Sequence, residues 1–395
     1  MLIKNVHIVD DSQDFYGDIR IADGLIVEIG ENLSSDDRIL DFNGQDVLLL
    51  PAFTDLHVHF RDPGYTYKED VASGSRAAVK GGYTAVNLMP NTNPVCSSMD
   101  IVRDVERRVA EVGLVFANQT MSMTKNLEGR DYDHLKALAP GEILFVTDDG
   151  KGVNDDQVMK DIFTICKAKD ITVMAHEEDS RYSKTDMRKA ENLMTFRDLA
   201  LIEETGGRIH FCHVSTKEVV NAIAEAKAKG LAVSCEVTPH HITATGEETG
   251  HYRVNPPFRE QEDVDALIKG IQDGIIDAIA TDHAPHSLED KQNGAPGMTG
   301  LEIAFALSYT ALVKTGKITL SRLMKLMSAT PSAMMKLNKG KIRTGMEADL
   351  VIVDVVNPYI IDSSTFVSKG KNTPFNGKEV YGRILHTFKS GKEVY

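Results

Sequence analysis

Apolar residues follow two different spacings along the middle of this chain, and the two spacings alternate. Short continuous apolar runs are typical of buried strands, whereas apolar residues that recur every three to four positions are typical of helices with one buried face. Stretches with helical spacing separate the apolar runs from one another. The runs predict eight buried strands, at residues 52–60, 83–89, 114–121, 143–147, 171–176, 209–214, 231–237 and 276–281.

The stretch after Ser215 illustrates the helices that are expected between these strands. Val219 and Ile223 lie one helical turn apart, Glu218 follows Ser215 by three positions as in a capping box, and Gly230 ends the apolar repeat. Eight strand–helix units between residues 51 and 340 predict an α/β fold of the (β/α)8 TIM-barrel type. A doubly wound open sheet is the alternative, but no glycine-rich phosphate loop follows any of the strands.

The two ends of the chain have a different pattern, in which short strand-like runs flank tight turns. Asp23-Gly24 and Ser390-Gly391 are the clearest of these turns. Neither end has enough strands to bury a core of its own. We therefore expect residues 1–50 and 341–395 to form one small composite β-sandwich domain, with the barrel of residues 51–340 inserted between them.

The composition is that of a globular protein, with 42% hydrophobic and 26% charged residues. No apolar run reaches the roughly 18 residues of a membrane span, and the N-terminus lacks a signal-peptide pattern. A net charge of −14 argues against nucleic acid as a partner. We expect a cytoplasmic protein whose four cysteines are free thiols, because their spacing suggests no pairing; these are Cys96, Cys166, Cys212 and Cys235.

His57 and His59 lie two positions apart on the first predicted strand. Side chains on a strand alternate between its faces, so both imidazoles are expected on one face, together with Asp55. Leu56 and Val58 make the opposite face apolar. Two neutral imidazoles in this arrangement are half of a site for a divalent metal such as zinc. The alternative is a pair of polar residues on a solvated strand face.

Residue types that bind metals end five of the eight predicted strands. In a (β/α)8 barrel the carboxyl ends of the strands meet at one face, where the chemistry takes place. Any one of these residues alone would more often be an ordinary polar side chain, but five converging strand ends indicate a metal site. The residues are His57 and His59, Asp148 and Asp149, His176, His213, and Asp282 with His283 and His286.

With these motifs the chain resembles the amidohydrolase superfamily and, within it, the bacterial dihydroorotase family in which an aspartate bridges two zinc ions. The resemblance covers nearly the whole chain. Between His176 and His213 the chain is shorter than is usual in that family. The matching motifs lie at residues 57–64, 89–92, 147–150, 212–216, 236–241, 255–257 and 281–286.

The resemblance implies a reaction and a set of ligands. Dihydroorotases reversibly cyclise N-carbamoyl-L-aspartate to (S)-dihydroorotate and water in de novo pyrimidine biosynthesis. A hydroxide that bridges the metals would attack the ring amide, and Asp282 would carry the proton to the departing nitrogen. The two zinc ions of each subunit would be held by His57, His59 and Asp282 on one side and by His176 and His213 on the other, with Asp149 between them.

The substrate of such an enzyme carries a carboxylate, which needs a partner. Arg61 shares the strand face of His59, and its guanidinium fork suits a carboxylate. The resemblance adds Asn91 and His286 to the carboxylate and Asn255 to the ring. Each has a plain alternative: an arginine paired with a neighbouring acid such as Asp62 or Glu69, a turn-forming asparagine, and a loop histidine.

Two other segments near the expected site carry predictions. His240 and His241 are assigned to supporting or packing roles, because six ligand positions are already filled. Residues 287–300, rich in glycine and proline, are expected to form a mobile rim over the site.

Two other functions fit parts of this pattern. A hydantoinase, dihydropyrimidinase or allantoinase would share the fold and the histidines, but such enzymes carry a carboxylated lysine at the fourth strand, for which Lys151 is the only nearby competitor of Asp149. A non-catalytic scaffold of the same superfamily would be expected to lack a ligand, and all six are present. The resemblance also implies a homodimer, in some cases associated with aspartate transcarbamoylase.

Overall fold

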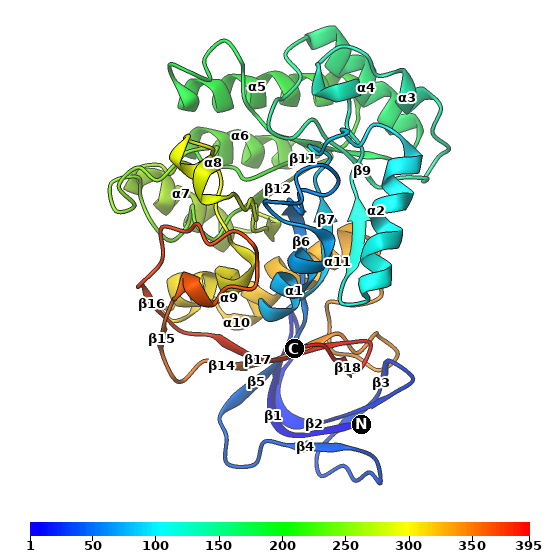
Figure 1. The fold of residues 1–395 in the computed structure, drawn as a ribbon, viewed down its shortest axis with the longest axis vertical. Coiled ribbons are helices and arrows are strands. Elements are labelled where there is room, and N and C mark those ends of the chain that lie inside the picture. Colours follow the sequence, from blue (N-terminus) through cyan, green and yellow to red (C-terminus); the bar gives the residue numbers. More distant parts are fainter.

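Eight parallel strands lie at the centre of the upper part of the molecule in the computed structural model, which describes all 395 residues (Figure 1). Every one of them falls inside a stretch that the sequence predicts, although each is shorter than expected. The strands are β6 (Phe53–Val58), β7 (Tyr83–Leu88), β8 (Phe116–Gln119), β9 (Phe145–Val146), β10 (Thr172–Ala175), β11 (Ile209–Phe211), β12 (Val233–Val237) and β13 (Ala278–Ile279).

These strands pair in strict chain order. β6, β7 and β8 form one parallel run, and β9 to β13 form another. Isolated parallel bridges join Met121 to Val146, between the two runs, and Val58 to His283, so that the last strand also meets the first. This order excludes the doubly wound alternative, whose strand order reverses at a switch point.

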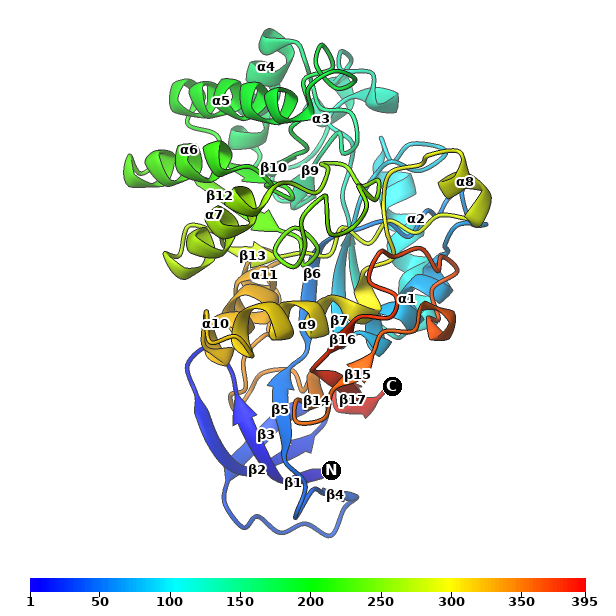
Figure 2. The same ribbon diagram turned by 90° about the vertical axis from the view of Figure 1, so that its left-hand side faces the viewer.

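Helices surround these strands on the outside in both views (Figures 1 and 2). The α-helices are α1 (Val71–Lys80), α2 (Met99–Val112), α3 (Asp133–Lys136), α4 (Asp156–Ala168), α5 (Met187–Thr205), α6 (Lys217–Ala228), α7 (Gln261–Gln272), α8 (Leu288–Gln292), α9 (Ala304–Ser308), α10 (Leu320–Met324) and α11 (Thr330–Met334). Shorter 3-10 or π turns are η1 (Lys125–Leu127), η2 (Leu301–Ile303), η3 (Tyr309–Val313), η4 (Lys325–Ala329) and η5 (Ser363–Thr365). No helix has the length and apolar character that crossing a membrane requires.

The capping box expected at Ser215 is wrong. Helix α6 is capped instead by Thr216, whose side chain accepts a hydrogen bond from the amide of Val219. Ser215 is drawn away because its hydroxyl donates to the buried carboxylate of Glu191. A tertiary contact therefore overrides the local signal.

Strands from both chain ends share one sheet in the lower part of the molecule (Figure 1). β5 pairs antiparallel with β14, from Leu350 opposite Pro51 to Asp354 opposite Val47. The sheet runs β18-β17-β14-β5-β1-β2-β3, with β4 beside β1, and the expected second layer of a sandwich stays a prediction. The strands are β1 (Leu2–Val9), β2 (Asp14–Ala22), β3 (Leu25–Gly30), β4 (Ile39–Asp41), β5 (Val47–Pro51), β14 (Leu350–Asp354), β17 (Arg383–Lys389) and β18 (Lys392–Glu393).

Side chains from both ends pack in one core on one face of this sheet. Ile8 and Leu49 from the N-terminal strands lie with Ile352 and Phe388 from the C-terminal strands, and all four are fully buried. The two ends therefore stabilise each other through apolar burial as well as backbone hydrogen bonds. The four cysteines are buried and free, as the sequence predicts.

One C-terminal segment behaves differently from the expected β-domain. Between β15 (Tyr359–Ile360) and β16 (Glu379–Val380) the chain leaves the sheet and rises to lie between α1 and α8 (Figure 2). These two short strands pair only with each other. The segment that they bracket thus leaves the terminal sheet and reaches the part of the molecule that holds the parallel strands (Figure 2).

Candidate metal centre

The six predicted metal ligands come together at the carboxyl ends of the parallel strands. His57 lies on β6, and the other five follow the ends of β6, β9, β10, β11 and β13. Neighbouring parallel strands end at one edge, so residues more than 200 positions apart in the chain become neighbours. All six are buried: His57, His59, Asp149, His176, His213 and Asp282.

Asp149 lies among the four imidazoles. Its Oδ1 atom is 3.3 Å from Nε2 of His57, 3.5 Å from Nδ1 of His176 and 3.8 Å from Nε2 of His213. Its Oδ2 atom is 3.5 Å from Nε2 of His59. Two ligands of one tetrahedral zinc ion, each about 2.0–2.1 Å from it, have donor atoms about 3.3 Å apart. The spacing is therefore that of groups arranged around ions.

Asp282 completes the other side of the cluster. Its Oδ1 atom lies 3.1 Å from Nε2 of His59 and 3.6 Å from Nε2 of His57. On the far side, Nδ1 of His176 is 3.0 Å from Nε2 of His213. Two of the compact donor groups in this cluster are His57 with His59 and Asp282, and His57 with Asp149 and His213.

The Nε2 atom of His57 supplies a direct test of whether a metal fits. It is buried and has no hydrogen-bond partner, although carboxylate oxygens of Asp149 and Asp282 lie close by. A buried polar atom without a partner is costly and needs an explanation. A cation between this nitrogen and the two carboxylates provides one, so the residues present fit a divalent metal.

Carboxylates behind the histidines fix their orientation. Glu236 on β12 lies 3.0 Å from Nδ1 of His57 and 3.1 Å from Nε2 of His210. Burial opposes ionisation of Glu236, but hydrogen bonds from these two histidines lower its pKa to about 2. A carboxylate on the remote nitrogen of a histidine holds the ring and raises its basicity. Cys212 also lies beside His57, but burial raises the pKa of its thiol and keeps it protonated.

Glu178 plays the same part for His176. Its Oε2 atom lies 3.0 Å from Nε2 of His176 and accepts a 2.6 Å hydrogen bond from Nδ2 of Asn255. Asn255, predicted to contact the substrate ring, is therefore tied to the metal side of the site.

Asn91 connects two candidate ligands. Its Oδ1 atom lies 2.9 Å from Nδ1 of His59, and its Nδ2 donates a 3.0 Å hydrogen bond to Asp149. The residue that the sequence suggests for the substrate carboxylate thus also orients a histidine and an aspartate. This is more specific than a plain turn former.

Arg61 and His286 form a separate, positively charged side of the site. Nη2 of Arg61 lies 3.3 Å from Nε2 of His286, and its Nε donates to the carbonyl of Pro285 at 3.4 Å. Arg61 forms no ion pair, because Asp62 pairs with Arg108 at 2.6 Å. The other acid considered for it, Glu69, lies 3.4 Å from His283. The alternative of an arginine paired with a neighbouring acid is therefore wrong.

His286 is held as a neutral ring. Its Nε2 lies 2.9 Å from the carbonyl of Pro296 and donates to it, which leaves Nδ1 to face Nζ of Lys68 at 3.3 Å. Burial and the charges of Arg61 and Lys68 lower the pKa of His286 to about 3. The positive charge of this side therefore comes from Arg61 and Lys68.

Backbone conformation marks the same residues. Arg61, His213 and Asp282 have φ values of +59°, +35° and +46°, in the left-handed region that side chains other than glycine rarely adopt. Such conformations cost roughly 1–3 kcal/mol each and cluster at functional sites.

A cavity of 190 Å³ joins the metal side to the arginine side. Nine of the ten predicted site residues line it, and the tenth, His57, lies fully buried beneath it. The lining residues are His59, Arg61, Asn91, Asp149, Gly150, His176, His213, Asn255, Asp282, Ala284, His286, Pro296 and Gly297.

Comparison with known proteins shows the family of this chain. Residues 48–394 match the amidohydrolase family. The chain belongs to the amidohydrolase family. A dihydroorotase of Clostridium botulinum is 48% identical over 396 residues, which cover 100% of this chain and 99% of the relative. A dihydroorotase of a Thermoanaerobacter species is 39% identical over 421 residues, covering 100% and 97%.

Solved structures of two other proteins have a similar fold. The L-hydantoinase (dihydropyrimidinase) of Arthrobacter aurescens has a TM-score of 0.85 at 26% identity, covering 100% of this chain and 95% of that one. The dihydropyrimidinase of Brevibacillus agri has a TM-score of 0.87 at 22% identity, covering 100% and 94%. The second similarity is one of fold alone.

Two further predictions concern residues around the cavity. His241 lies 2.7 Å from Oγ1 of Thr238 and 3.1 Å from the carbonyl of Pro256, which agrees with a supporting role. Residues 287–300 do form part of the rim, because Pro296 and Gly297 line the cavity. Their expected mobility stays a prediction.

Proposed function

We propose that this amidohydrolase is a dihydroorotase, which interconverts N-carbamoyl-L-aspartate and (S)-dihydroorotate. The main evidence is the position of Arg61, which lines the same cavity as the candidate metal ligands and has no carboxylate partner. The reaction requires both an amide-hydrolysing centre and a binding site for a free carboxylate. Full-length identity of 48% to a dihydroorotase supports the same function.

The metal side is proposed to hold two zinc ions. His57, His59 and Asp282 would hold one ion, His176 and His213 the other, and Asp149 would contact both. The unpartnered Nε2 of His57 and the convergence on Asp149 support this assignment. When bound, zinc ions lower the pKa of water and polarise a carbonyl oxygen, which is the chemistry that opening a cyclic amide needs.

Asp282 is proposed as the proton carrier. Although burial opposes ionisation, the hydrogen bond from His59 and the charge of His57 hold the pKa of Asp282 below its usual range. Its carboxylate is therefore ionised at neutral pH and can accept a proton from the attacking water. It lines the cavity, so it can return that proton to the ring nitrogen as the amide bond breaks.

Arg61 is proposed to bind the substrate's carboxylate. The planar guanidinium offers two parallel N–H donors to a carboxylate, a geometry that an ammonium group cannot copy. His286 adjoins it as a neutral imidazole. Asn91 and Asn255 also line the cavity, where Asn91 donates to Asp149 and Asn255 donates to Glu178 behind His176. The substrate would thus lie with its amide at the metal side and its carboxylate at Arg61.

The bridging role is assigned to Asp149 and not to a carboxylated lysine. Lys151 is exposed and lies outside the cavity. Gly150 and Gly152 on either side have positive φ values, and the amides of Lys151 and Gly152 both donate to the carbonyl of Asp148 in a tight turn. The turn carries Lys151 away from the position that Asp149 occupies.

The wider organisation is proposed as follows. The closed, sequential order of eight parallel strands supports a (β/α)8 barrel at residues 51–340, and the shared sheet supports one composite β-domain from residues 1–50 and 341–395. A homodimer, an association with aspartate transcarbamoylase and a cytoplasmic location stay predictions.

A substrate panel with metal analysis tests the proposal. The purified protein is loaded with zinc, its metal content is measured, and hydrolysis of dihydroorotate, dihydrouracil and hydantoin is compared. We expect two zinc ions per chain and turnover of dihydroorotate far above that of the two uncharged rings. Preference for hydantoin or dihydrouracil would indicate a hydantoinase-type enzyme, and a fully loaded protein without any turnover would indicate a scaffold.

A further inference from the structure

A five-residue strap from the C-terminal part of the chain touches the rim of the active site. The strap, residues 368–372, lies in the segment between β15 and β16 that rises away from the terminal sheet (Figure 2). It contacts the loop that carries Arg61 and the loop that carries His286. A segment that served only the terminal β-domain would not need to make either contact.

The first anchor of the strap is Glu69, a fully buried carboxylate eight positions after Arg61. Glu69 accepts hydrogen bonds from the hydroxyl of Ser368 and, at 3.3 Å, from the amide of Lys369. Nζ of Lys369 also donates to the carbonyl of Thr66 at 2.5 Å. The strap is therefore fixed to the loop that follows Arg61.

The second anchor is Asn372. Its Oδ1 atom accepts a 3.1 Å hydrogen bond from the amide of His286 and a 3.3 Å bond from the hydroxyl of Thr299. Its Nδ2 atom donates to the carbonyl of Gly297 at 3.2 Å, and its own carbonyl accepts from the amide of Thr299 at 2.7 Å. One side chain thus holds His286 and the cavity wall at Gly297.

Gly370 packs between the two anchors without room for a side chain. A Cβ atom there would lie 2.7 Å from Cβ of Pro285 and 2.9 Å from Oγ1 of Thr299. Pro285 is the residue whose carbonyl accepts the hydrogen bond from Nε of Arg61. The strap therefore packs against the side chain of Pro285, the residue whose carbonyl holds Arg61.

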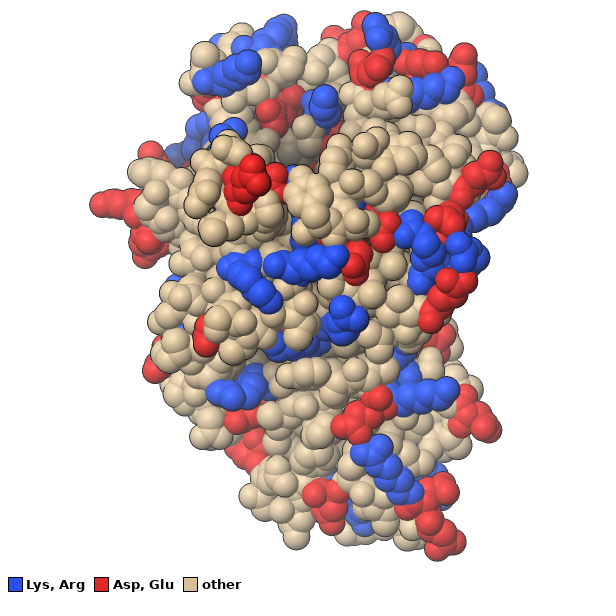
Figure 3. All heavy atoms as spheres, in the orientation of Figure 1, with Lys and Arg blue, Asp and Glu red and all other residues tan.

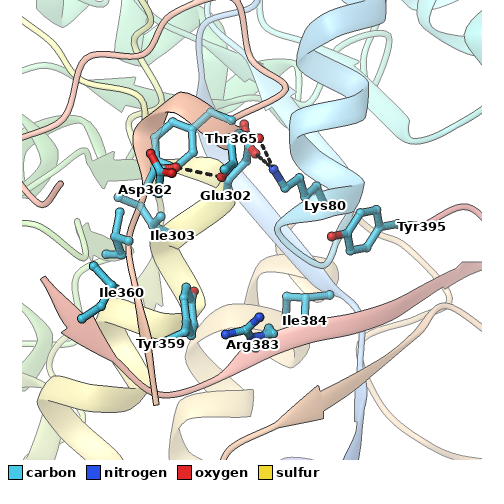
Figure 4. Close-up of a pocket in the computed structure, with 12 residues that line it drawn as sticks. Lys80, Glu302, Ile303, Tyr359, Ile360, Asp362, Thr365, Arg383, Ile384 and Tyr395 are labelled. Carbon is cyan, nitrogen blue, oxygen red and sulfur yellow. Dashed lines mark hydrogen bonds and ion pairs between the residues drawn. The ribbon is translucent and has the colours of Figure 1, made fainter. Parts of the chain in front are cut away.

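The root of the strap is held independently of the active site. Figure 4 shows Lys80 reaching both Glu302 and Thr365, at 2.8 Å and 2.6 Å. Glu302 also accepts hydrogen bonds from the amides of Val367 and Ser368. A hollow of 390 Å³ lies beside these contacts and is lined by Lys80, Glu302 and Thr365.

The cations around the strap are used in these contacts. Lys and Arg side chains gather across the middle of the face in Figure 3, over α1 and the segment that holds the strap. Lys68 pairs with Asp290, Lys369 with Asp70, and Nζ of Lys371 donates to the carbonyl of Ser368. Lys369 and Lys371 therefore hold the strap itself, and Lys68 joins the loop after Arg61 to α8.

We propose that the strap positions Arg61 and His286 relative to each other, and that Asn372 is a positioning residue for binding of the substrate's carboxylate. This inference rests on the proposed function, because it takes Arg61 and His286 as the carboxylate side of the site. The hydrogen bonds of the Asn372 side chain go to His286, Thr299 and Gly297 and to none of the candidate metal ligands, so its loss is expected to act on substrate binding and not on the chemical step.

Three variants test the strap in the full-length zinc-loaded enzyme. Asn372→Ala removes all three side-chain contacts, Asn372→Asp keeps the oxygen that accepts from His286, and Asn357→Ala, at an exposed asparagine just before β15 and outside the strap, is the matched control. Losing one hydrogen bond of about 1 kcal/mol corresponds to a change of about fivefold. We expect Asn372→Ala to raise KM for dihydroorotate about five- to tenfold with kcat within about twofold, Asn372→Asp to raise it less, and Asn357→Ala to match the parent.

A second measurement does not depend on turnover. Hydrogen exchange of the peptide that contains His286 and Gly297 should be faster in Asn372→Ala than in the parent or in Asn357→Ala. Unchanged KM together with unchanged exchange would overturn the proposal, as would a loss of kcat equal to the rise in KM. If Asn372→Ala fails to fold, Asn372→Asp and Gly370→Ala decide by the same two readouts. A parent without activity on dihydroorotate, combined with faster exchange in Asn372→Ala, would contradict the proposed function while supporting the strap.

Discussion

The carboxylate of Glu236 lies 3.0 Å from Nδ1 of His57, and both side chains are fully buried. Glu236 accepts a hydrogen bond from Nδ1–H of His57. The proton of the neutral ring therefore stays on Nδ1, and the lone pair is on Nε2, the atom that faces Asp149 and Asp282. Glu236 therefore selects the form of His57 that can bind a metal.

Replacing Glu236 should weaken metal binding without removing a ligand. Carboxylates behind ligand histidines are worth about 10- to 100-fold in metal affinity, so Glu236→Ala should lose zinc to a chelator at a correspondingly lower concentration. Glu203→Gln, on an exposed helix face, is the control. Zinc retention equal to the parent in a folded Glu236→Ala would mean that the hydrogen bond is only structural.

Asp282→Asn should keep the fold but remove the proton carrier. A positioned acid–base group contributes roughly 10²–10⁴ in rate, and we expect kcat for dihydroorotate to fall by at least that factor. Metal content is measured alongside, since the amide can still offer an oxygen. Turnover within about tenfold of the parent would rule out Asp282 as proton carrier.

Arg61→Lys and Arg61→Ala should separate charge from geometry at the carboxylate. Both should raise KM for dihydroorotate, with the alanine variant worse because it loses the charge as well as the fork. Dihydrouracil, which lacks the carboxylate, should be a poor substrate of the parent and scarcely poorer in either variant. Equal slowing of both substrates by Arg61→Ala would show that the arginine serves the fold instead.

The bridge is tested by a pair of neighbouring substitutions. Lys151→Ala should keep both zinc ions and full turnover, whereas Asp149→Ala should lose at least one ion and most activity. Protein prepared in carbon-dioxide-depleted buffer should also be fully active, because a carboxylate side chain needs no carboxylation. Reactivation by bicarbonate, or zinc loss in the lysine variant alone, would favour a carbamate bridge.

Removing residues from 342 onward should yield insoluble protein, although every candidate ligand remains. The truncation strips β14 from β5, which leaves a fully buried apolar strand with an open edge, and it also removes the strap. The measurement is the soluble fraction after expression. A soluble, active truncated chain would show that the terminal sheet is dispensable.

Much of this site could be predicted because most of its residues follow from local sequence patterns. His57 and His59 share a face through the period of two on a strand, and strand-end positions bring Asp149 and Asp282 to the same edge. Glu178 is not among the predicted residues. A signal for it existed, since it lies two positions after His176. Residues further from the strand ends gave weaker signals.

Contacts between segments that lie far apart in the chain could not be predicted from local sequence patterns. Glu236 reads as one polar residue within a buried strand, and only the pairing of β11 with β12 brings it to His210. Asn372 lies 86 positions from His286 in a stretch without periodicity. Such contacts depend on how whole elements pack, which spacing along one segment does not encode.

The pairing of β5 with β14 also sets a schedule for synthesis of the chain. Leu350 lies opposite Pro51, so 299 positions (350 minus 51) separate the partners. At roughly 5–20 residues per second, a ribosome leaves the edge of β5 without its partner for about 15–60 s. The rest of the strand–helix units emerge within that interval and can assemble first. A nascent-chain chaperone that shields strand edges would therefore be needed most by β5, until β14 has been synthesised.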